Sequence, residues 1–314
     1  MTSTRLAIRK QMLDEDWHEG LYGTATAGAV GTLTDTTLLQ VGGNATSQQA
    51  GNHLYRPAAA TASDVYRRVN SDGYAPSTGV LTHGGPDWAV APLASSDTGY
   101  YELWPWDPRL VNSAIDRALT TRCFSMQRDS VTTNGQSRYD VTASPFSLTI
   151  TSPQAQIVEV MQVWGTDPNA EVHEWANAGK TWWPELDDGT LYVRFDPAPT
   201  GTLQIGWKKP YSALANDAAS TACPIDYVAW AAYYELFIAL EKRAIRRGEP
   251  EGQYSELKDF AYARYWAEAQ KYLGRFAATI YMPRPRSRTW TPGPRMGRPS
   301  NVLGGAGGRS ISGV

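Results

Sequence analysis

Side chains that could do chemistry are present in this sequence, but they do not fall at catalytic spacings. An acyl-transfer enzyme with a nucleophile elbow needs the pattern GxSxG, which is absent; residues 308–312 come nearest. His83 and the two glycines after it resemble an oxyanion-hole loop, but without the elbow we interpret them as a turn. The segment Gly179-Lys180-Thr181 looks like the end of a phosphate-binding loop, yet Glu174 replaces the first glycine of that pattern. The sequence therefore predicts no catalytic residue.

Histidines and cysteines show no metal-ligand spacing either. The motif HExxH is absent, and no two histidines share a ligand spacing on one element. Cys123 and Cys223 lie far apart without a CxxC pattern, so we interpret them as buried thiols, not as a disulfide or a zinc site. We expect no metal and no cofactor. The histidines are His18, His53, His83 and His173.

Acidic pairs and tryptophans leave a second class of function open. Asp14 with Asp16 lies near the end of a predicted helix, and Asp187-Asp188 lies in a predicted turn, so both pairs favour a solvated position. Glycosidase carboxylates come from different elements, so spacing alone does not exclude them. Trp175 and the pair Trp182-Trp183 could stack on sugar rings, although packing is the favoured interpretation. A carbohydrate-binding module or glycosidase therefore stays as an alternative.

The strongest electrostatic feature is the C-terminal tail, residues 281–314. It is rich in proline and glycine and holds six arginines and no acid, so the rest of the chain carries −8 against a total of −2. Such a composition cannot form a core, and we expect the tail to be extended until a partner orders it. Arginine forks can bind acidic protein surfaces or phosphates, and we favour protein docking. The predicted docking residues are Arg284, Arg286, Arg288, Trp290, Arg295, Arg298 and Arg309.

Composition describes a soluble chain of two or three domains with an unusual aromatic content. Charged residues make up only 19% of the 314 residues, while Trp (12) and Tyr (17) are abundant and suit both cores and contacts. The N-terminus lacks the pattern of a signal peptide, and no apolar run approaches a membrane span. We expect synthesis in a cytoplasm and no membrane partner.

Periodicity predicts an α+β fold in which helices form a bundle. Leu6, Lys10, Leu13 and Trp17 form one helical stripe, and Asp107 followed by Pro108 is a strong helix start. Short alternating runs separated by turns, such as residues 70–73, predict two small β modules, the first of them a barrel or sandwich. The predicted order is an N-terminal helix (1–20), a small β module (21–104), a central helix (105–125), a second β module (126–212), an antiparallel helix hairpin (222–276) and the extended tail (281–314).

This order of elements resembles the head–tail connector or adaptor proteins of the neck of tailed bacteriophages. The resemblance covers about residues 3–275 and is carried by order and texture. Its segments are Gly23-Thr24-Ala25-Thr26-Ala27-Gly28, Asp64-Val65-Tyr66-Arg67-Arg68-Val69, Thr78-Gly79-Val80-Leu81-Thr82, the helix from Asp107, and Trp207-Lys208-Lys209-Pro210-Tyr211 before the helix from Pro224. The long second β region departs from the family.

The resemblance implies a structural, non-enzymatic virion protein made in the host cytoplasm. It implies a homo-oligomeric ring, a dodecamer in many members, bound to the portal protein and to tail or stopper proteins. Packaged DNA would pass through its channel without specific contacts, and the tail would reach along the portal or a neighbouring subunit. Another structural virion role, as a tail-tip or decoration subunit, remains the nearer alternative.

Overall fold

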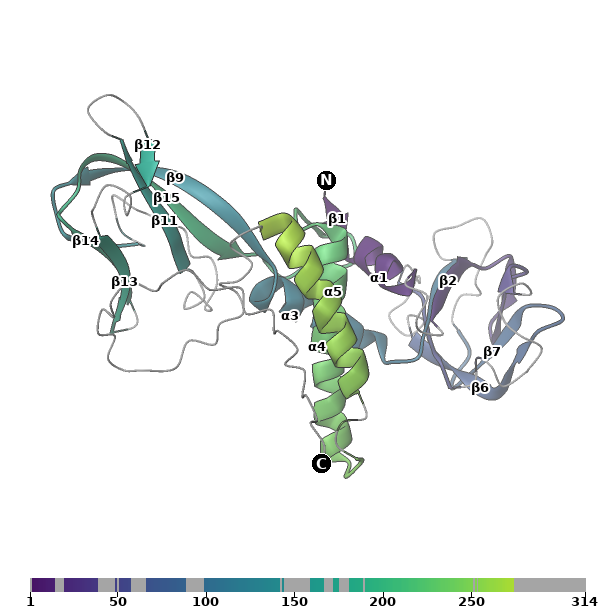
Figure 1. The fold of residues 1–314 in the computed structure, drawn as a ribbon. Helices are drawn as coiled ribbons and strands as arrows, with labels where there is room; N and C mark the ends of the chain where they lie inside the picture. Colours follow the sequence, from purple (N-terminus) through teal and green to yellow (C-terminus); the bar gives the residue numbers. More distant parts are fainter. Residues whose placement is uncertain are drawn as a thin grey trace, which may run out of the picture. The chain divides into compact units, whose positions relative to one another are not determined.

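The computed structural model describes most of the chain up to Leu273. The described residues are 2–14, 20–38, 49, 51–57, 66–88, 99–141, 143, 159–166, 172–174, 181–188, 190–250, 252 and 254–273. The chain divides into two compact units, Met1–Ile280 and Tyr281–Val314, and all described elements belong to the first. Figure 1 shows its elements in chain order.

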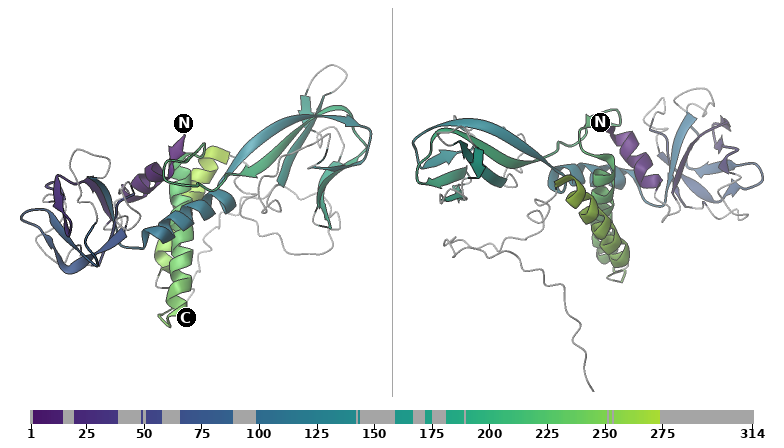
Figure 2. Two further views of the ribbon diagram at one scale, coloured as in Figure 1. Left: turned by 180° about the vertical axis from the view of Figure 1, so that it is seen from behind. Right: turned by 45° about the horizontal axis from the view of Figure 1, so that its top comes forward.

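Four helices are labelled in the described part. Helix α4 is buried on nearly every side between Tyr227 and Tyr233 and packs against α1, α3 and α5 (Figure 2). Asp107 caps α3 by accepting a hydrogen bond from the Arg109 N–H at 2.9 Å, and Pro108 follows, as the sequence predicted. None of these helices combines the length and apolarity that crossing a membrane requires. The bounds are α1 Arg5–Leu13, α3 Pro108–Thr121, α4 Ile225–Arg246 and α5 Ser255–Leu273.

The first β region is one seven-stranded antiparallel sheet in the order β2-β8-β5-β6-β7-β4-β3. Its two end strands are consecutive in the chain and are separated only by Ala25 and Thr26. Ala25 N–H donates to Gly99 O on the β8 side, while Thr26 N–H donates to Thr34 O of β4, so the sheet closes as a barrel. The strands are β2 Leu21–Thr24, β3 Ala27–Ala29, β4 Thr32–Thr34, β5 His53–Tyr55, β6 Tyr66–Ala75, β7 Val80–Gly84 and β8 Tyr100–Trp104.

A single core fills this barrel. It contains Leu33, Leu54, Leu81 and Leu103 together with Tyr101, all essentially inaccessible to solvent. The Tyr101 hydroxyl donates to buried Asp35 at 2.8 Å, which satisfies a carboxylate inside the barrel.

The second β region consists of two sheets. β9 and β15 pair along eleven residues each, and β11 and β12 complete a four-stranded sheet; β10, β14 and β13 form a three-stranded one. A two-stranded pair, β1 with β16, joins the N-terminus to the segment before α4. The bounds are β1 Ser3–Thr4, β9 Phe124–Asn134, β10 Arg138–Asp140, β11 Glu159–Thr166, β12 Val172–Glu174, β13 Thr181–Asp187, β14 Thr190–Asp196, β15 Thr200–Pro210 and β16 Ser220–Thr221.

The predicted fold class, a helical bundle interrupted by small β modules, is wrong. Strands account for about as much of the described chain as helices, and the seven-stranded sheet is a large element in its own right. Pairing between segments far apart in sequence, such as β5 with β8, creates this sheet, and short-range periodicity cannot reveal it. The predicted turn at residues 70–73 is also wrong, because β6 continues through it with an irregular register against β7.

Candidate assembly interface

The tail residues that the sequence predicts to dock lie outside the described residues. Arg284, Arg286, Arg288, Trp290, Arg295, Arg298 and Arg309 therefore stay a prediction. The described part offers three other clusters of charged and aromatic side chains, which are considered in turn.

The first is a buried charge cluster around Arg9 of α1. The Arg9 side chain is fully buried, and its Nε lies 2.9 Å from Oε2 of the equally buried Glu102 of β8. One terminal nitrogen lies 2.7 Å from Asp217 and donates to Asn112 of α3, and the guanidinium lies 4.9 Å from the centre of the Tyr55 ring. One side chain thus joins α1, the barrel, α3 and the segment before β16.

Glu102 is held by donors on every side. Besides Arg9, the Trp104 indole N–H donates at 2.8 Å and the Tyr100 hydroxyl at 3.2 Å. Burial raises the pKa of Glu102, while Arg9 and these donors oppose the rise. Burial also disfavours the charged form of Arg9, but Glu102 and Asp217 more than offset it and raise the pKa of Arg9. The carboxylate is saturated with donors, so we assign it to structure and not to proton transfer.

Two further buried contacts extend this cluster. Arg5 donates from one terminal nitrogen to both carboxylate oxygens of Asp116 at 2.8 Å and also to the carbonyl of Leu214. Glu235 of α4, almost inaccessible to solvent, accepts a hydrogen bond from Arg122 at 2.6 Å and forms an ion pair with Arg117, whose Nε lies 3.2 Å from Oε2. Ion pairs therefore fasten α1 to α3 and α3 to α4.

The second cluster is a tyrosine surface on α4 and α5, formed by Tyr227, Tyr234, Tyr262, Tyr265 and Tyr272. Tyr227 and Tyr265 are buried and stacked with ring centres 5.7 Å apart, and both hydroxyls donate to the Arg122 carbonyl. Tyr262 and Tyr272 leave 36% and 41% of their surface exposed. The Arg122 guanidinium lies 5.1 Å from the centre of the Tyr234 ring. Tyrosine and arginine together are the residue types that protein interfaces enrich.

The third cluster lies on the opposite flank of α5. Phe260, 42% exposed, packs edge-on against Trp230 of α4, and Arg264 lies over both rings. Like the tyrosine surface, it presents aromatic rings to solvent beside a guanidinium.

The residues that suggested enzymatic chemistry are engaged in structural contacts. Arg68 of β6 donates to Nε2 of His53 at 3.3 Å, which leaves Nδ1–H to donate to the Tyr66 hydroxyl. Burial, then Arg68, lowers the pKa of His53 to about 4. His83 lies against Trp88, with one ring nitrogen 3.3 Å from the Val30 carbonyl. His18 lies outside the described residues, as does the environment of the His173 side chain.

The cysteines are buried free thiols. Burial raises the pKa of Cys123, and a hydrogen bond with Cys223 adds to the rise, so the thiol is poorly ionised. This confirms the sequence interpretation. Within the described ranges, no group of three or more histidine, cysteine or acidic side chains could hold a metal ion.

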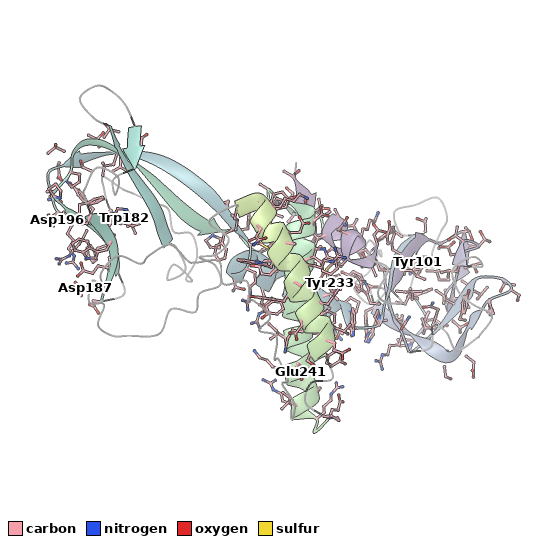
Figure 3. The ribbon with its side chains drawn as sticks, viewed as in Figure 1. Tyr101, Trp182, Asp187, Asp196, Tyr233 and Glu241 are labelled. Carbon is pink, nitrogen blue, oxygen red and sulfur yellow. The ribbon has the colours of Figure 1, made fainter. Side chains whose placement is uncertain are left out.

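The candidate sugar-binding residues are only partly placed. Trp182 and Trp183 lie half-buried on β13, whereas Trp175 lies outside the described residues (Figure 3). Asp187 pairs with Arg138 at 2.5 Å, so one carboxylate of the Asp187-Asp188 pair is a surface ion-pair partner.

A shallow polar groove of about 430 Å³ runs beside α3. The two exposed guanidinium groups in it are already paired, Arg109 with Asp107 and Arg117 with Glu235. We therefore assign no reaction to it. Its lining residues are Arg109, Asn112, Ser113, Asp116, Arg117, Thr120 and Ala213.

The comparisons with known proteins give no relative. The chain matches no family model, and neither the curated proteins nor the solved structures contain a significant match.

The predicted stripe on α1 matches the buried face only in part. Leu13 is buried, Leu6 and Lys10 are half-buried, and Trp17 lies outside the described residues. The other buried residues of the helix are Arg5, Ile8, Arg9 and Met12. Two arginines face the interior because carboxylates of distant elements lie there and form ion pairs with them. The spacing of Ile8 and Met12 predicts this buried face. The two arginines on the same face, however, favour an exposed position when the sequence alone is considered.

We predict that Arg9→Met destabilises the fold by about 3–5 kcal/mol, because it leaves Glu102 buried without its counter-charge. The double variant Arg9→Met with Glu102→Met should recover about 2 kcal/mol or more of that loss. Urea unfolding measures both. Arg109→Met is the matched control, since its partner Asp107 is near the surface, and it should cost less than about 1 kcal/mol. Additive losses in the double variant would contradict the coupling.

We also predict an acid-sensitive component of stability from His53. The folded pKa is lowered to about 4 from an unfolded value of 6.5, so the unfolded chain binds the proton first. The component is complete above pH 6.5 and is lost as the pH falls from 6.5 to about 4. The pH dependence of the free energy of unfolding should become flatter in this window for His53→Gln, and identical slopes would contradict the assignment.

Proposed function

We propose that this chain is a structural subunit of a larger assembly, specifically a head–tail adaptor in the neck of a tailed bacteriophage virion. The order of its described elements, α1, the barrel, α3, the second β region, α4 and α5, supports this placement because the resemblance rests on that order. An adaptor subunit requires a folded body whose outer faces bind other subunits, and this body does not have to be a helical bundle.

The observation that carries the proposal is the tyrosine surface. Tyr262 and Tyr272 are exposed on α5, which packs on α4 through its buried residues Ala261, Tyr265, Ala269 and Leu273. Their neighbours Tyr227 and Tyr265 are fixed by hydrogen bonds to the Arg122 carbonyl, so the exposed rings stand on a rigid base. Rigid tyrosines around an arginine lose little entropy on binding and favour a protein contact.

Charge distribution supports the same role. The buried carboxylates of Glu102 and Glu235 are neutralised by arginines, which leaves these two groups little capacity for proton transfer. We place the six arginines of residues 281–314 on the portal protein or on a neighbouring subunit, with tail or stopper proteins as the other partners. DNA would pass a channel formed by a body that carries −8 without being gripped.

A ring subunit needs two different contact faces, because head-to-tail contacts join unlike surfaces. The tyrosine surface and the Phe260 flank lie on two sides of the α4–α5 hairpin and could serve such contacts. A tail-tip or decoration subunit would use similar surfaces. A stable monomer that binds glycans would instead favour the carbohydrate-binding alternative.

We predict that Tyr262→Ala combined with Tyr272→Ala weakens self-association by at least about tenfold, because exposed tyrosines of an interface carry much of its binding free energy. Sedimentation velocity over a concentration series measures the effect. Val30→Ala is the control, since Val30 is 46% exposed on the barrel and lies outside the α4–α5 hairpin. Equal behaviour of the control and the double variant would remove the tyrosine surface from the assembly.

We also predict that a chain ending at Ile280 folds normally but no longer docks. The described cores are built from residues that precede Ile280, so the circular dichroism spectrum and the thermal transition should stay unchanged. Binding to the portal protein of the same virion, followed by size-exclusion chromatography, should be lost. Undiminished docking of the truncated chain would refute this role of the tail.

A further inference from the structure

The end of α4 carries a dense group of cations. Lys242, Arg243, Arg246 and Arg247 are all exposed, and they surround Ile245, which leaves 46% of its surface in solvent. We call residues 242–247 the basic tip.

The basic tip is held rigidly. Gly248, with φ +73°, ends α4: its N–H donates to the Ile245 carbonyl, and Glu249 N–H donates to the Ala244 carbonyl, both at 3.0 Å. The Glu241 carboxylate accepts from the backbone N–H groups of Gly252 and Tyr254, which fastens the connection to α5 (Figure 3). The cations are therefore displayed on an ordered scaffold.

Contacts within the described chain account for little of this charge. Arg247 has a long ion pair with Glu249 at 3.8 Å, whereas Lys242, Arg243 and Arg246 have no ion pair among the described residues. Cations do stabilise a helix C-terminus, by about 0.3–1 kcal/mol each, and the effect falls off within the last turn. Four cations and an exposed isoleucine exceed that need, and they fit an acidic partner that also offers an apolar side chain.

The chain itself contains such a partner. Residues 14–19 read Asp-Glu-Asp-Trp-His-Glu, with four acids and Trp17 in six positions. Asp14 is the C-cap of α1, where the helix dipole disfavours negative charge. An acidic run after a helix C-terminus opposes the helix dipole, and such conflicts with local preference are typical of functional segments. Its charge and its single large apolar residue complement those of the basic tip.

The start of the acidic run lies away from the basic tip of its own copy. The Tyr233 hydroxyl donates to the Met12 carbonyl, which places the end of α1 level with the middle of α4. An α-helix rises about 1.5 Å per residue, so the basic tip begins about 14 Å farther along and ends about 21 Å away. Asp14, at the start of the run, is the C-cap of α1, and Leu21, just after its end, pairs with Leu103 of β8.

We infer that the basic tip of one copy binds residues 14–19 of a second copy. Ile245 packs against Trp17, and the cations pair with the surrounding acids. The contact joins unlike surfaces and can therefore repeat around a closed ring. This inference rests on the proposed assembly and names one of its subunit contacts.

A charge-reversal experiment in the full chain tests this contact. One variant carries Lys242→Glu, Arg243→Glu and Arg246→Glu, and the other carries Glu15→Lys, Asp16→Lys and Glu19→Lys. Each alone should weaken self-association by at least about tenfold, because like charges then face each other. An equimolar mixture of the two variants should assemble again, since each supplies the sign that the other needs. Light scattering measures all three samples.

The outcomes separate the two proposals. Wild-type association that both reversals leave unchanged overturns the contact but not the assembly. A wild-type chain that stays monomeric at every concentration overturns both. Failure of the mixture to assemble, or rescue only when both reversals are in one chain, also overturns the contact between copies. Binding of labelled duplex DNA that depends on the basic tip, without any effect on association, would assign the tip to phosphates instead.

Discussion

The buried ion pair between Arg9 and Glu102 is the contact on which the folded body depends. A carboxylate with no access to solvent is costly unless a cation and hydrogen-bond donors neutralise it, and Arg9, Trp104 and Tyr100 do so here. Because Arg9 belongs to α1 and Glu102 to the barrel, neither element can separate without leaving a buried charge unpaired. Asp217 and Asn112 extend the same requirement to α3 and to the segment before α4.

The buried charges and the exposed faces of the molecule have different roles. Inside, the carboxylates of Glu102, Asp116 and Glu235 are bound by arginines, which makes them fastenings between elements. On the outside, the α4–α5 hairpin exposes tyrosines, one phenylalanine and the basic tip. Buried carboxylates paired with arginines and exposed aromatic and basic faces fit a structural subunit, and this division supports the proposed role.

The sequence predicted local features well where one short segment decides them. Asp107 with Pro108 starts α3, and the runs at β8, β14 and the α4–α5 hairpin are recognisable because their periodicity and caps are local. The barrel and the charge cluster could not be predicted in this way. β2 closes against β8 across most of the barrel sequence, and Arg9 meets Glu102 only in the fold. Buried arginines look like solvent-facing residues until their distant partners are known, so the missed arginines of α1 and the wrong fold class have the same cause.

The claim that this chain works as one of several identical subunits is tested most directly by electron microscopy of the purified full-length protein. The account predicts closed rings of many copies, with the terminal Pro- and Arg-rich residues bound to a neighbouring molecule. Isolated single copies at high concentration, with those residues packed against their own body, would contradict it.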